Sequence, residues 1–444
     1  MEQLNTQQQQ AYTAIVSGSN TFVTGPGGTG KSYLIKRLLE TLPGSMKVAI
    51  TAMTGCAALL LGGAGVKGRG HAKTLHSWAG IGLGKEPVAE LVKRIKKSGR
   101  ALKNWLTTDI LIVDEVSMLT ADLLEKLDMI GQHLRSSGRP FGGLQVVFMG
   151  DFYQLPPVVR ATGEDVGAHF AFASPRWKTI MERTVNLTEI VRQRDPVFQD
   201  LLNAVRKGQL GAEHLAILEA RKGLAWKDKE IKPTLLFSRR AEVDTINGAN
   251  LKALEGRHVT WKARTVIDAD APSKALNLED GDIVRAIETM DREAAYEPEL
   301  TLAVGAQVML VTNLDMEAGL VNGSRGVVVN FVGADAQPYP VVRFLNGREV
   351  AIMDAGWEIE GLKGVKRMQV PLRLAYAVTI HRAQGATLDC ALIDIGTRTF
   401  EYGQAYVALS RVRSLDSLYV WDVNPKAVKA HPRVSEFYAS LGAV

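Results

Sequence analysis

The amino-acid sequence predicts an α/β protein with two parallel sheets and a smaller inserted β domain. Four short apolar runs each stop at glycine, threonine or aspartate and lead into helical or loop sequence, at Thr21–Thr24, Val48–Thr51, Ile110–Val113 and Val146–Met149. This alternation is typical of a parallel sheet, whose ligands lie at the carboxyl ends of its strands. Between residues 256 and 370 the pattern changes to short β-rich runs with glycine-containing turns, which is typical of hairpins.

These patterns divide the chain into three domains. Residues 1–182 form the first α/β domain, and 183–255 together with 371–444 form the second. Strands of the second domain are predicted near Leu235–Phe237, Ala375–Thr379 and Ala391–Asp394. Residues 256–370 form the inserted β domain, with runs at Gln307–Val311, Gly326–Phe331 and Val341–Phe344. The dipeptide Asn247-Gly248 is not taken as a hairpin turn, because its flanks are helical in character.

The composition is that of an ordinary globular protein. Hydrophobic residues make up 46% and charged residues 23% of the 444 residues, which is enough apolar material for several cores and excludes a disordered chain. No window approaches 18 uncharged apolar residues, so no membrane span is expected. The balance of 53 basic against 47 acidic residues gives a net charge of +6, which is compatible with a polyanionic partner.

The cysteines and the first residues bear on compartment and metal content. Cys56 and Cys390 lie far apart, and the histidines lack ligand spacing, so we expect two reduced thiols and no metal site formed by protein ligands alone. The segment Met1–Gln10 is polar and glutamine-rich, unlike a secretory signal. With no targeting segment in view, we expect a cytoplasmic protein.

Residues 82–104 form a strongly basic segment. Its only acidic residues are Glu86 and Glu90, against the basic residues Lys85, Lys93, Arg94, Lys96, Lys97, Arg100 and Lys103. A basic helix is as often a solvated surface as a binding element, so this composition leaves both interpretations open.

A phosphate-binding loop follows the first predicted strand. Residues 25–32 match the GxxxxGK[ST] pattern between a strand and a helix. Glycines let backbone N–H groups turn toward phosphates, at a helix N-terminus that favours anions. The pattern predicts ATP bound through Gly25, Gly27, Gly28, Thr29 and Gly30, with Lys31 reaching the β- and γ-phosphates and Ser32 ligating Mg²⁺.

Two further strand ends carry polar residues that suit ATP hydrolysis. The run from Ile110 ends in Asp114-Glu115, where Asp114 is expected to support Mg²⁺ and Glu115 to polarise the attacking water. Gln154 follows the next strand, where its amide is expected to sense the γ-phosphate. An acidic pair at a strand end is common in itself, and its significance comes from the upstream phosphate loop.

At this point the sequence resembles a known family. The motifs at 25–32, 51–57, 74–80, 114–118, 150–157, 191–193, 379–385 and 407–411 follow the order found in superfamily 1 helicases. The residues in these motifs are similar to those of the petite-integration-frequency (PIF) family of 5′-to-3′ DNA helicases, on the RecD-like branch. Arg382-Ala383 replaces the usual Lys-Ser, and the long flanking regions of eukaryotic members are absent. We therefore expect a bacterial, phage or mobile-element type of protein.

The resemblance implies two RecA-like domains with ATP between them. Gln8 matches the glutamine that recognises adenine, and Gln384 matches the one that couples nucleotide to DNA. Arg192 and Arg411 match the arginines that the second domain offers to the phosphates, and such groups stabilise charge on a transferring phosphoryl group. Without the resemblance, either arginine would be taken for a surface ion-pair residue.

The resemblance also implies a track for single-stranded DNA. Thr54, Ala57, His76 and Trp78 are expected to contact the strand from the first domain, and Thr379 and His381 from the second. Non-specific binding of a strand combines phosphate contacts with aromatic stacking. The alternative for Trp78 is a core aromatic residue, and for each histidine a structural role. The basic segment coincides with the family's strand-separating insertion, and 256–370 with its small barrel over the DNA channel.

The sequence thus favours a monomeric ATP-dependent 5′-to-3′ DNA helicase acting on single-stranded DNA and on forked or 5′-tailed duplexes, away from any membrane. One alternative is a RecD-like motor subunit that unwinds only within a larger complex. Another is an ATP-gated nucleic-acid-binding switch that does not move. A kinase or GTPase is disfavoured, because the chain lacks a second-substrate lid and an Asn-Lys-x-Asp motif.

Overall fold

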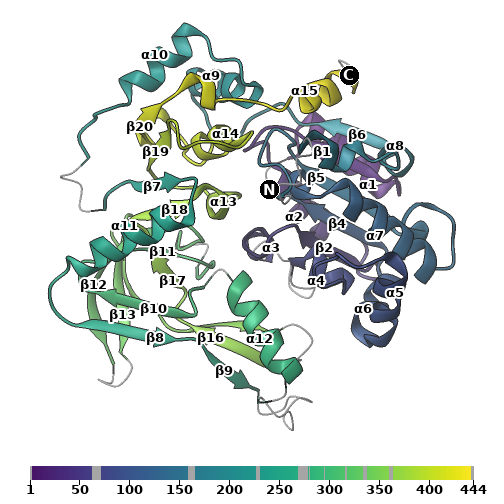
Figure 1. Cartoon of the computed structure of the whole chain (residues 1–444), viewed down its shortest axis with the longest axis horizontal. Coiled ribbons are helices and arrows are strands. Elements are labelled where there is room, and N and C mark those ends of the chain that lie inside the picture. The colour runs from purple at the N-terminus through teal and green to yellow at the C-terminus, as the bar shows by residue number, and fades with distance from the viewer. Residues whose placement is uncertain are drawn as a thin grey trace. The chain divides into compact units, whose positions relative to one another are not determined.

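The computed structural model describes residues 3–62, 72–158, 166–226, 231–268, 279, 281–294, 296–315, 318–333, 338–359 and 364–441 (Figure 1). The chain forms two compact units. The first unit comprises Met1–Ala220, Ile395–Leu415 and Val423–Val444, and the second comprises Arg221–Asp394 and Asp416–Asp422. This division follows contacts and differs from the three domains expected from the sequence, whose boundaries stay a prediction. Among the described residues, no helix is long and apolar enough to cross a membrane.

A six-stranded parallel sheet organises the first unit. The strand order is β3-β2-β4-β5-β1-β6, and each strand runs parallel to its neighbours. The strands are β1 (Thr21–Thr24), β2 (Val48–Ala52), β3 (Lys73–Thr74), β4 (Ile110–Asp114), β5 (Gln145–Gly150) and β6 (Arg183–Asn186). The four central strands are those expected from the apolar runs, so the predicted α/β fold with a parallel sheet is confirmed.

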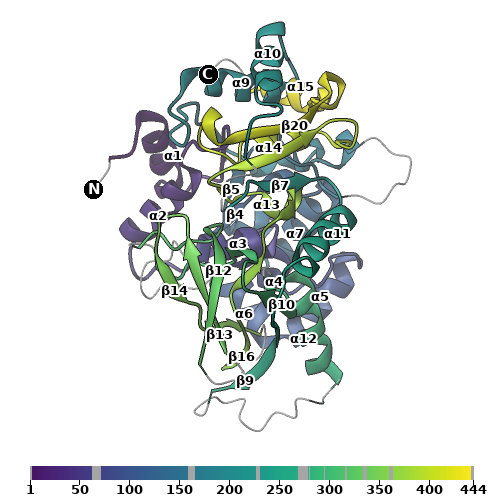
Figure 2. The ribbon, with the colours of Figure 1, turned by 90° about the vertical axis from the view of Figure 1, so that its left-hand side faces the viewer.

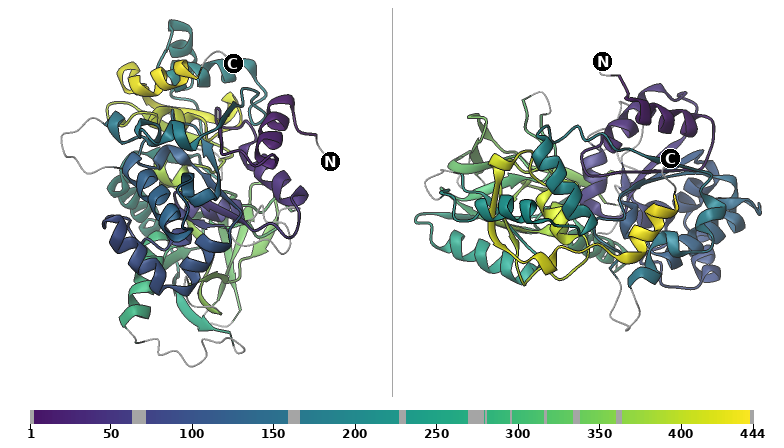
Figure 3. Two further views of the ribbon diagram at one scale, coloured as in Figure 1. Left: turned by 90° about the vertical axis from the view of Figure 1, so that its right-hand side faces the viewer. Right: turned by 90° about the horizontal axis from the view of Figure 1, so that it is seen from above.

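Helices cover both faces of this sheet because alternate residues of each strand point to opposite sides. Ile110 and Ile112 of β4 pack in one cluster with α1 (Thr6–Val16), α2 (Lys31–Thr41) and α3 (Gly55–Gly62). Leu111 and Val113 pack on the other face, in a cluster that includes α4 (Leu75–Ala79), α5 (Val88–Lys97), α6 (Gly99–Thr107), α7 (Ala121–Leu134), α8 (Trp177–Ile180) and α15 (Pro432–Ser440). In the left view of Figure 3, the first group is purple and α5 to α7 are dark blue.

The rest of the first unit consists of short elements. Its other helices are α9 (Pro196–Lys207), α10 (Ala212–Ala220) and α14 (Gln404–Leu409). Single 3₁₀ turns are η1 (Val116–Met118), η2 (Pro140–Gly143), η3 (Val166–His169), η4 (Ala171–Ala173) and η7 (Pro425–Ala427). The turn η6 (Leu415–Ser417) lies at the passage between the units.

The second unit contains a four-stranded sheet in the order β18-β7-β19-β20. Its strands are β7 (Thr234–Phe237), β18 (Ala377–Thr379), β19 (Ala391–Ile395) and β20 (Leu418–Val423), and β7 runs parallel to both β18 and β19. Helix α11 (Arg240–Lys252) holds Asn247, whose side chain donates to the carbonyl of Ala377 and accepts from its amide. Asn247-Gly248 is therefore helical, as its flanks predict. The short helix α13 (Ile380–Ala383) follows β18 directly.

Between α11 and β18 the chain is built mainly from antiparallel strands. A five-stranded sheet has the order β14-β13-β12-β11-β17, and smaller sheets pair β10 with β8 and join β15, β16 and β9. The strands are β8 (His258–Lys262), β9 (Arg264–Ile267), β10 (Glu299–Ala303), β11 (Gln307–Leu310), β12 (Arg325–Val332), β13 (Tyr339–Phe344), β14 (Glu349–Ala351), β15 (Ala355–Glu358), β16 (Val365–Gln369) and β17 (Leu372–Leu374). Figure 2 shows β12, β13 and β14 side by side.

Hairpins predicted from the glycine-containing turns are present: β11 pairs with β12 around Asn322-Gly323, and β13 pairs with β14 around Asn346-Gly347. This region also holds helix α12 (Gly281–Glu293), which the hairpin pattern does not indicate. Asp291 of α12 accepts hydrogen bonds from the Arg367 guanidinium and the Tyr296 hydroxyl, so the helix is tied to β16 by polar contacts.

Candidate nucleotide and nucleic-acid sites

The phosphate loop, residues 25–30, connects β1 to the N-terminus of α2 in the first unit. Gly28 and Gly30 adopt φ values of 88° and 83°. A Cβ at Gly28 would lie 2.6 Å from Cβ of Arg192, and one at Gly30 would lie 2.5 Å from Nε2 of Gln8. The glycines are therefore required both by backbone conformation and by close neighbours.

Lys31 bends back over this loop. Its Nζ donates to the carbonyl of Gly25 at 2.7 Å and to that of Pro26 at 2.9 Å. Burial lowers the pKa of its ammonium group, while the carboxylates of Asp151, Asp114 and Glu115 oppose that shift. Ser32 is exposed at the first turn of α2, as its predicted role requires. The loop thus brings a buried amine and an accessible hydroxyl to one place.

Asp114 and Glu115 form a buried acidic pair where β4 ends. The Asp114 carboxylate accepts the backbone amide of Glu115 at 2.9 Å. Burial, reinforced by the Glu115 carboxylate, raises the pKa of Asp114 to about 7. Glu115 has φ 55° and ψ 42°, a left-handed conformation that is uncommon for a residue other than glycine. Such backbone strain clusters at functional sites, where the surrounding structure holds it.

Gln154 lies in the loop that leaves β5. It is buried, and its backbone amide donates to the carbonyl of Asp151 at 2.9 Å. The Asp151 carboxylate is fully buried and accepts two hydrogen bonds from Arg206 of α9, at 2.8 Å and 2.9 Å. This bidentate geometry is the strong form of an arginine–carboxylate pair. The loop that carries Gln154 is thus anchored by a buried ion pair.

Both predicted arginines lie close to the phosphate loop. The backbone amides of Val191 and Arg192 donate to the carbonyl of Gly28, and Nη1 of Arg192 is 3.4 Å from the carbonyl of Ser410. A Cβ on Gly27 would be 3.9 Å from Nη2 of Arg411. Burial, and then repulsion by Arg192, lowers the pKa of Arg411 to about 10. The resemblance assigns both arginines to the second RecA-like domain, whereas by contacts both lie in the first unit.

Gln8 reaches the same loop from α1. Its Nε2 donates to the carbonyl of Thr29 at 3.2 Å, and its Oε1 accepts the backbone amide of Asn5 at 3.1 Å. The Asn5 side chain in turn accepts the backbone amide of Gln8, which completes a capping box. The structure therefore places Gln8 against the phosphate loop and fixes the start of α1 with the same side chain.

Sequence reasoning missed Tyr406 and Arg206. The hydroxyl of Tyr406 accepts the amide of Gly27 at 2.7 Å, although 379 positions separate them. A usable signal was present, because Tyr406 lies just before the predicted motif at 407–411. Arg206 carried no signal of its own, since its partner Asp151 is identified only by the fold.

The residues of the first unit that are predicted to contact nucleic acid follow β2 and β3. The Thr54 hydroxyl accepts the amide of Ala57 at the start of α3, and Ala57 itself is buried. Burial lowers the pKa of His76. Trp78 is 4% exposed and packs against Trp105 with ring centroids 4.9 Å apart. The indole is thus part of the core of this unit, and its predicted contact with DNA stays a prediction.

A matching arrangement occurs in the second unit. Thr379 ends β18 and accepts the amide of Arg382, which caps α13, and His381 is the second residue of that helix. Thr74 ends β3 and caps α4 in the same way, with His76 as second residue. The local counterpart of Thr379 is therefore Thr74, a residue absent from the predicted set although the Thr-x-His pattern repeats in the sequence. Gln384 ends α13 and is buried.

The basic segment is helical and exposes its charges. Helix α5 buries Leu91, Val92 and Ile95, and its lysines lie on the opposite side. Arg94 differs from them, because it donates to the carbonyl of Ile81 at 3.0 Å and pairs with Glu86. Lys93 pairs with Glu90 at 2.8 Å on the exposed surface. The exposed positive charge outside these two pairs rests on Lys85, Lys96, Lys97, Arg100 and Lys103.

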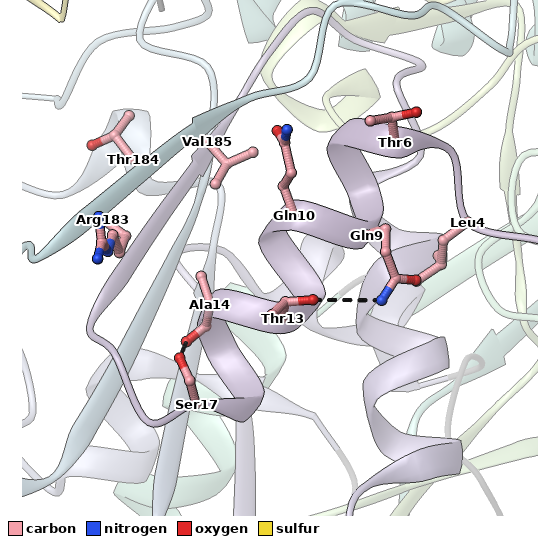
Figure 4. Close-up of a pocket in the computed structure, with 10 residues that line it drawn as sticks. All are labelled: Leu4, Thr6, Gln9, Gln10, Thr13, Ala14, Ser17, Arg183, Thr184 and Val185. Atoms are coloured by element: carbon pink, nitrogen blue, oxygen red, sulfur yellow. Dashed lines mark hydrogen bonds between the residues drawn. The ribbon is translucent and has the colours of Figure 1, made fainter.

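A separate cavity of about 750 Å³ lies between α1 and the edge strand β6 (Figure 4). It is lined by residues of α1, its flanks and β6, namely Leu4, Thr6, Gln9, Gln10, Thr13, Ala14, Ser17, Arg183, Thr184 and Val185. None of the predicted site residues lines it, since Gln8 turns from the same helix toward the phosphate loop.

Comparison with known proteins identifies similar chains. A family model described as PIF1-like helicase matches residues 3–215, and one described as DNA helicase Pif1, 2B domain matches 287–331. The ATP-dependent DNA helicase PIF1 of Homo sapiens is 41% identical over 99% of this chain, which spans 64% of that relative's length. The crystal structure of Pif1 helicase from Candida albicans is 36% identical, with both chains fully covered and a TM-score of 0.80.

A further solved structure carries ligands. It is Pif1 helicase from Bacteroides in complex with ADP-AlF3 and ssDNA, 28% identical, with 99% of this chain and 97% of that chain covered and a TM-score of 0.66.

The expectation of a bacterial, phage or mobile-element protein in the cytoplasm is wrong. The curated relatives at 37–41% identity are PIF1 helicases of vertebrates and a filamentous fungus. The expectation relied on missing flanking regions, and those flanks carry no information here, because this chain spans only part of the relatives' length.

Proposed function

The chain belongs to the PIF1-like helicase family, and we propose that it is an ATP-dependent DNA helicase that moves 5′ to 3′ along single-stranded DNA as a monomer. The proposal rests on one observation above all. One compact unit holds the phosphate loop and Lys31 together with the acidic pair, Gln154 and both arginines. The ADP-AlF3 and ssDNA bound by the Bacteroides relative support the same two ligands for this chain.

ATP is held through the loop amides and Lys31. Mg²⁺ prefers oxygen ligands, and the Ser32 hydroxyl and Asp114 carboxylate are oxygen donors next to that loop. When bound, the ion neutralises charge on the β- and γ-phosphates. Glu115, whose strained backbone fixes its side chain beside Asp114, takes a proton from the attacking water.

The arginines complete the site for hydrolysis. Arg192 and Arg411 stabilise charge that develops on the γ-phosphoryl group, a contribution of about 10³–10⁵ in rate for such groups. Gln154 reports on the γ-phosphate, and Gln8 recognises the adenine. Gln384 couples the nucleotide to DNA from the second unit.

Single-stranded DNA and forked or 5′-tailed duplexes are the proposed substrates. Thr54, Ala57 and His76 face the strand from the first unit, and Thr379 and His381 from the second. The burial of Trp78 and its packing against Trp105 favour a structural role for its indole. The exposed lysines of α5 and α6 lie in the segment proposed to separate the strands.

The test measures ATP hydrolysis with and without single-stranded DNA, and displacement of a strand from a 5′-tailed duplex. We expect strong stimulation by DNA and strand displacement that Lys31→Ala abolishes. ATP hydrolysis at the same rate with and without single-stranded DNA would overturn the proposal. DNA-stimulated hydrolysis without displacement would instead favour a RecD-like subunit or an ATP-gated binding switch, and single-molecule tracking on DNA would separate these by the presence of movement.

A further inference from the structure

The C-terminal helix α15 reaches the two strand ends that carry the nucleotide site. In Figure 1 it lies beside the end of the sheet formed by β1 and β6. The hydroxyl of Tyr438 is 2.6 Å from Oγ1 of Thr24, the last residue of β1 before the phosphate loop. The same hydroxyl lies 3.1 Å from the amide of Phe152 and 3.3 Å from Oδ1 of Asp151, the first residues after β5.

The direction of these hydrogen bonds follows from the chemistry of the groups. The phenol has one proton, and its oxygen accepts from the Phe152 amide. An ionised carboxylate can only accept, so the phenol donates to Asp151. The Thr24 hydroxyl then donates to the phenol oxygen. The chain of donors runs from Thr24 through Tyr438 to the buried carboxylate.

The ring of Tyr438 is held independently of its hydroxyl. It stacks on Tyr153 at 4.9 Å with an interplanar angle of 10°, and the Arg206 guanidinium lies 4.5 Å from the Tyr153 ring and 5.5 Å from the Tyr438 ring. The neighbouring Phe437 packs among Phe22, Phe152, Phe172 and Trp177. Removing the hydroxyl alone should therefore leave the helix in place.

The pairing between β1 and β5 does not by itself hold the two loops that follow these strands together. The pairing of β1 with β5 ends at Thr24 and Gly150, and the chains then leave toward Lys31 and Gln154. Tyr438 joins them immediately beyond the last paired residues. Asp151, which it contacts, is also the carboxylate that most strongly opposes the effect of burial on Lys31.

We propose that Tyr438 is a positioning residue of the ATPase site, which fixes the phosphate loop relative to the loop carrying Gln154. The inference rests on the proposed function. Binding of a diphosphate uses mainly the loop amides and Lys31, whereas the hydrolytic transition state also needs groups that follow β5. Loss of the hydroxyl therefore impairs the transition state more than the ground state.

The experiment compares Tyr438→Phe with wild type in the full chain. We expect the kcat of DNA-stimulated ATP hydrolysis to fall about tenfold, the size expected for one hydrogen bond to a charged group. The affinity for ADP with Mg²⁺ should stay within about twofold, while that for ADP with aluminium fluoride falls about tenfold. Tyr402→Phe is the matched control. It also removes a phenol hydroxyl from the first unit, but the ring of Tyr402 contacts His431 and not the residues around Tyr438.

Thr24 supplies a second pair of variants should Tyr438→Phe fail to fold. Thr24→Val removes the donor to Tyr438 and should reproduce the loss, whereas Thr24→Ser keeps the hydroxyl and should restore wild-type behaviour. The double variant Thr24→Val/Tyr438→Phe should be no worse than either single change, because both break one chain of hydrogen bonds.

Two results would overturn the inference: a lower Tm with unchanged preference for ADP–aluminium fluoride over ADP, or an equal loss in Tyr402→Phe. These binding measurements need no turnover. A wild-type protein without DNA-stimulated hydrolysis would therefore refute the proposed function while the role of Tyr438 is still decided.

Discussion

Glu115 is a single residue whose backbone conformation has a functional consequence. A glutamate at φ 55° is held by its surroundings, because Gly150 packs so closely that a Cβ there would lie 2.9 Å from the amide of Val116. We expect Glu115→Gln to keep nucleotide and DNA binding while turnover falls more than about tenfold, since the amide cannot take a proton. Lys31→Ala should lower both affinity and turnover. Retention of more than about a tenth of turnover by Glu115→Gln in a steady-state assay would remove its role as the base.

Asp114 gives a prediction about pH. Its pKa of about 7 in the folded protein exceeds the ordinary value of 3.8, so the folded state binds the extra proton between these values. The contribution of this proton to the free energy of unfolding is present in full below about pH 4 and is lost as the pH rises through about 7. In nucleotide-free protein, Asp114→Asn should flatten this part of the curve of Tm against pH, because asparagine mimics the protonated acid. Curves of equal slope for variant and wild type would contradict the raised pKa.

Residues of the site differ in how far the sequence could predict them. Lys31, Asp114 and Gln154 follow directly from strand ends and motif spacing, because each lies where a parallel strand leaves the sheet. Tyr406 and Tyr438 could not be found in this way. Their partners, the amide of Gly27 and the hydroxyl of Thr24, lie 379 and 414 positions away, and one hydrogen bond at such a separation leaves no periodic trace in a sequence.

Helix α5 shows how one element combines a structural arginine with exposed lysines. Arg94 holds the preceding loop by its hydrogen bond to the carbonyl of Ile81. A variant without Arg94 could therefore lose DNA binding because it is less stable, so Arg94 is left unchanged. We expect Lys93→Ala/Lys96→Ala/Lys97→Ala to reduce duplex unwinding more than DNA-stimulated hydrolysis, because the charges act on the duplex ahead of the motor. The control is Lys207→Ala, a charge removed from the last turn of α9.

The ratio of unwinding rate to hydrolysis rate is the deciding quantity for this helix. Equal loss of both would make α5 part of the general track for the strand. If the triple variant behaves like wild type, the lysines of α5 form only a solvated surface. Salt dependence adds a further check, since each neutralised phosphate of a single strand contributes about −0.7 to the log–log slope of affinity against salt.

Among elements, strands formed by apolar runs with sharp ends were predictable, and their observed bounds lie within two residues of the predicted ones, whereas short edge strands such as β3 and β6 were not predicted. Helix α12 was not predicted. Its sequence lies inside a region dominated by hairpin turns, and its ties to β16 through Asp291 and Arg367 are tertiary.

At the scale of the molecule, the chain leaves the first unit after Ala220 and returns to it twice, at Ile395–Leu415 and Val423–Val444. The returning segments bring Arg411, Tyr406 and Tyr438 to the phosphate loop or its strand. A change of composition marks the β-rich insertion, whereas the motif at 407–411 identifies Arg411 without showing that its segment returns to the first unit. The predicted boundaries at 182, 255 and 370 therefore stay predictions about domains, distinct from the compact units.

If the chain moves along DNA as proposed, the direction of movement is a property of the whole molecule, because it depends on which of two contacts with DNA is tight when ATP is bound. Each unit offers a threonine-capped short helix with a histidine, at Thr74-x-His76 and Thr379-x-His381. This likeness gives each unit one proposed contact with DNA and does not show which is tighter, so the proposed polarity rests on family membership. We expect displacement of a labelled strand from a 5′-tailed duplex and none from a 3′-tailed duplex, at equal tail length and saturating ATP. Blunt duplex is the control for binding at ends. Activity confined to the 3′-tailed substrate would reverse the proposed order of gripping, with the tight grip exchanged between the two units.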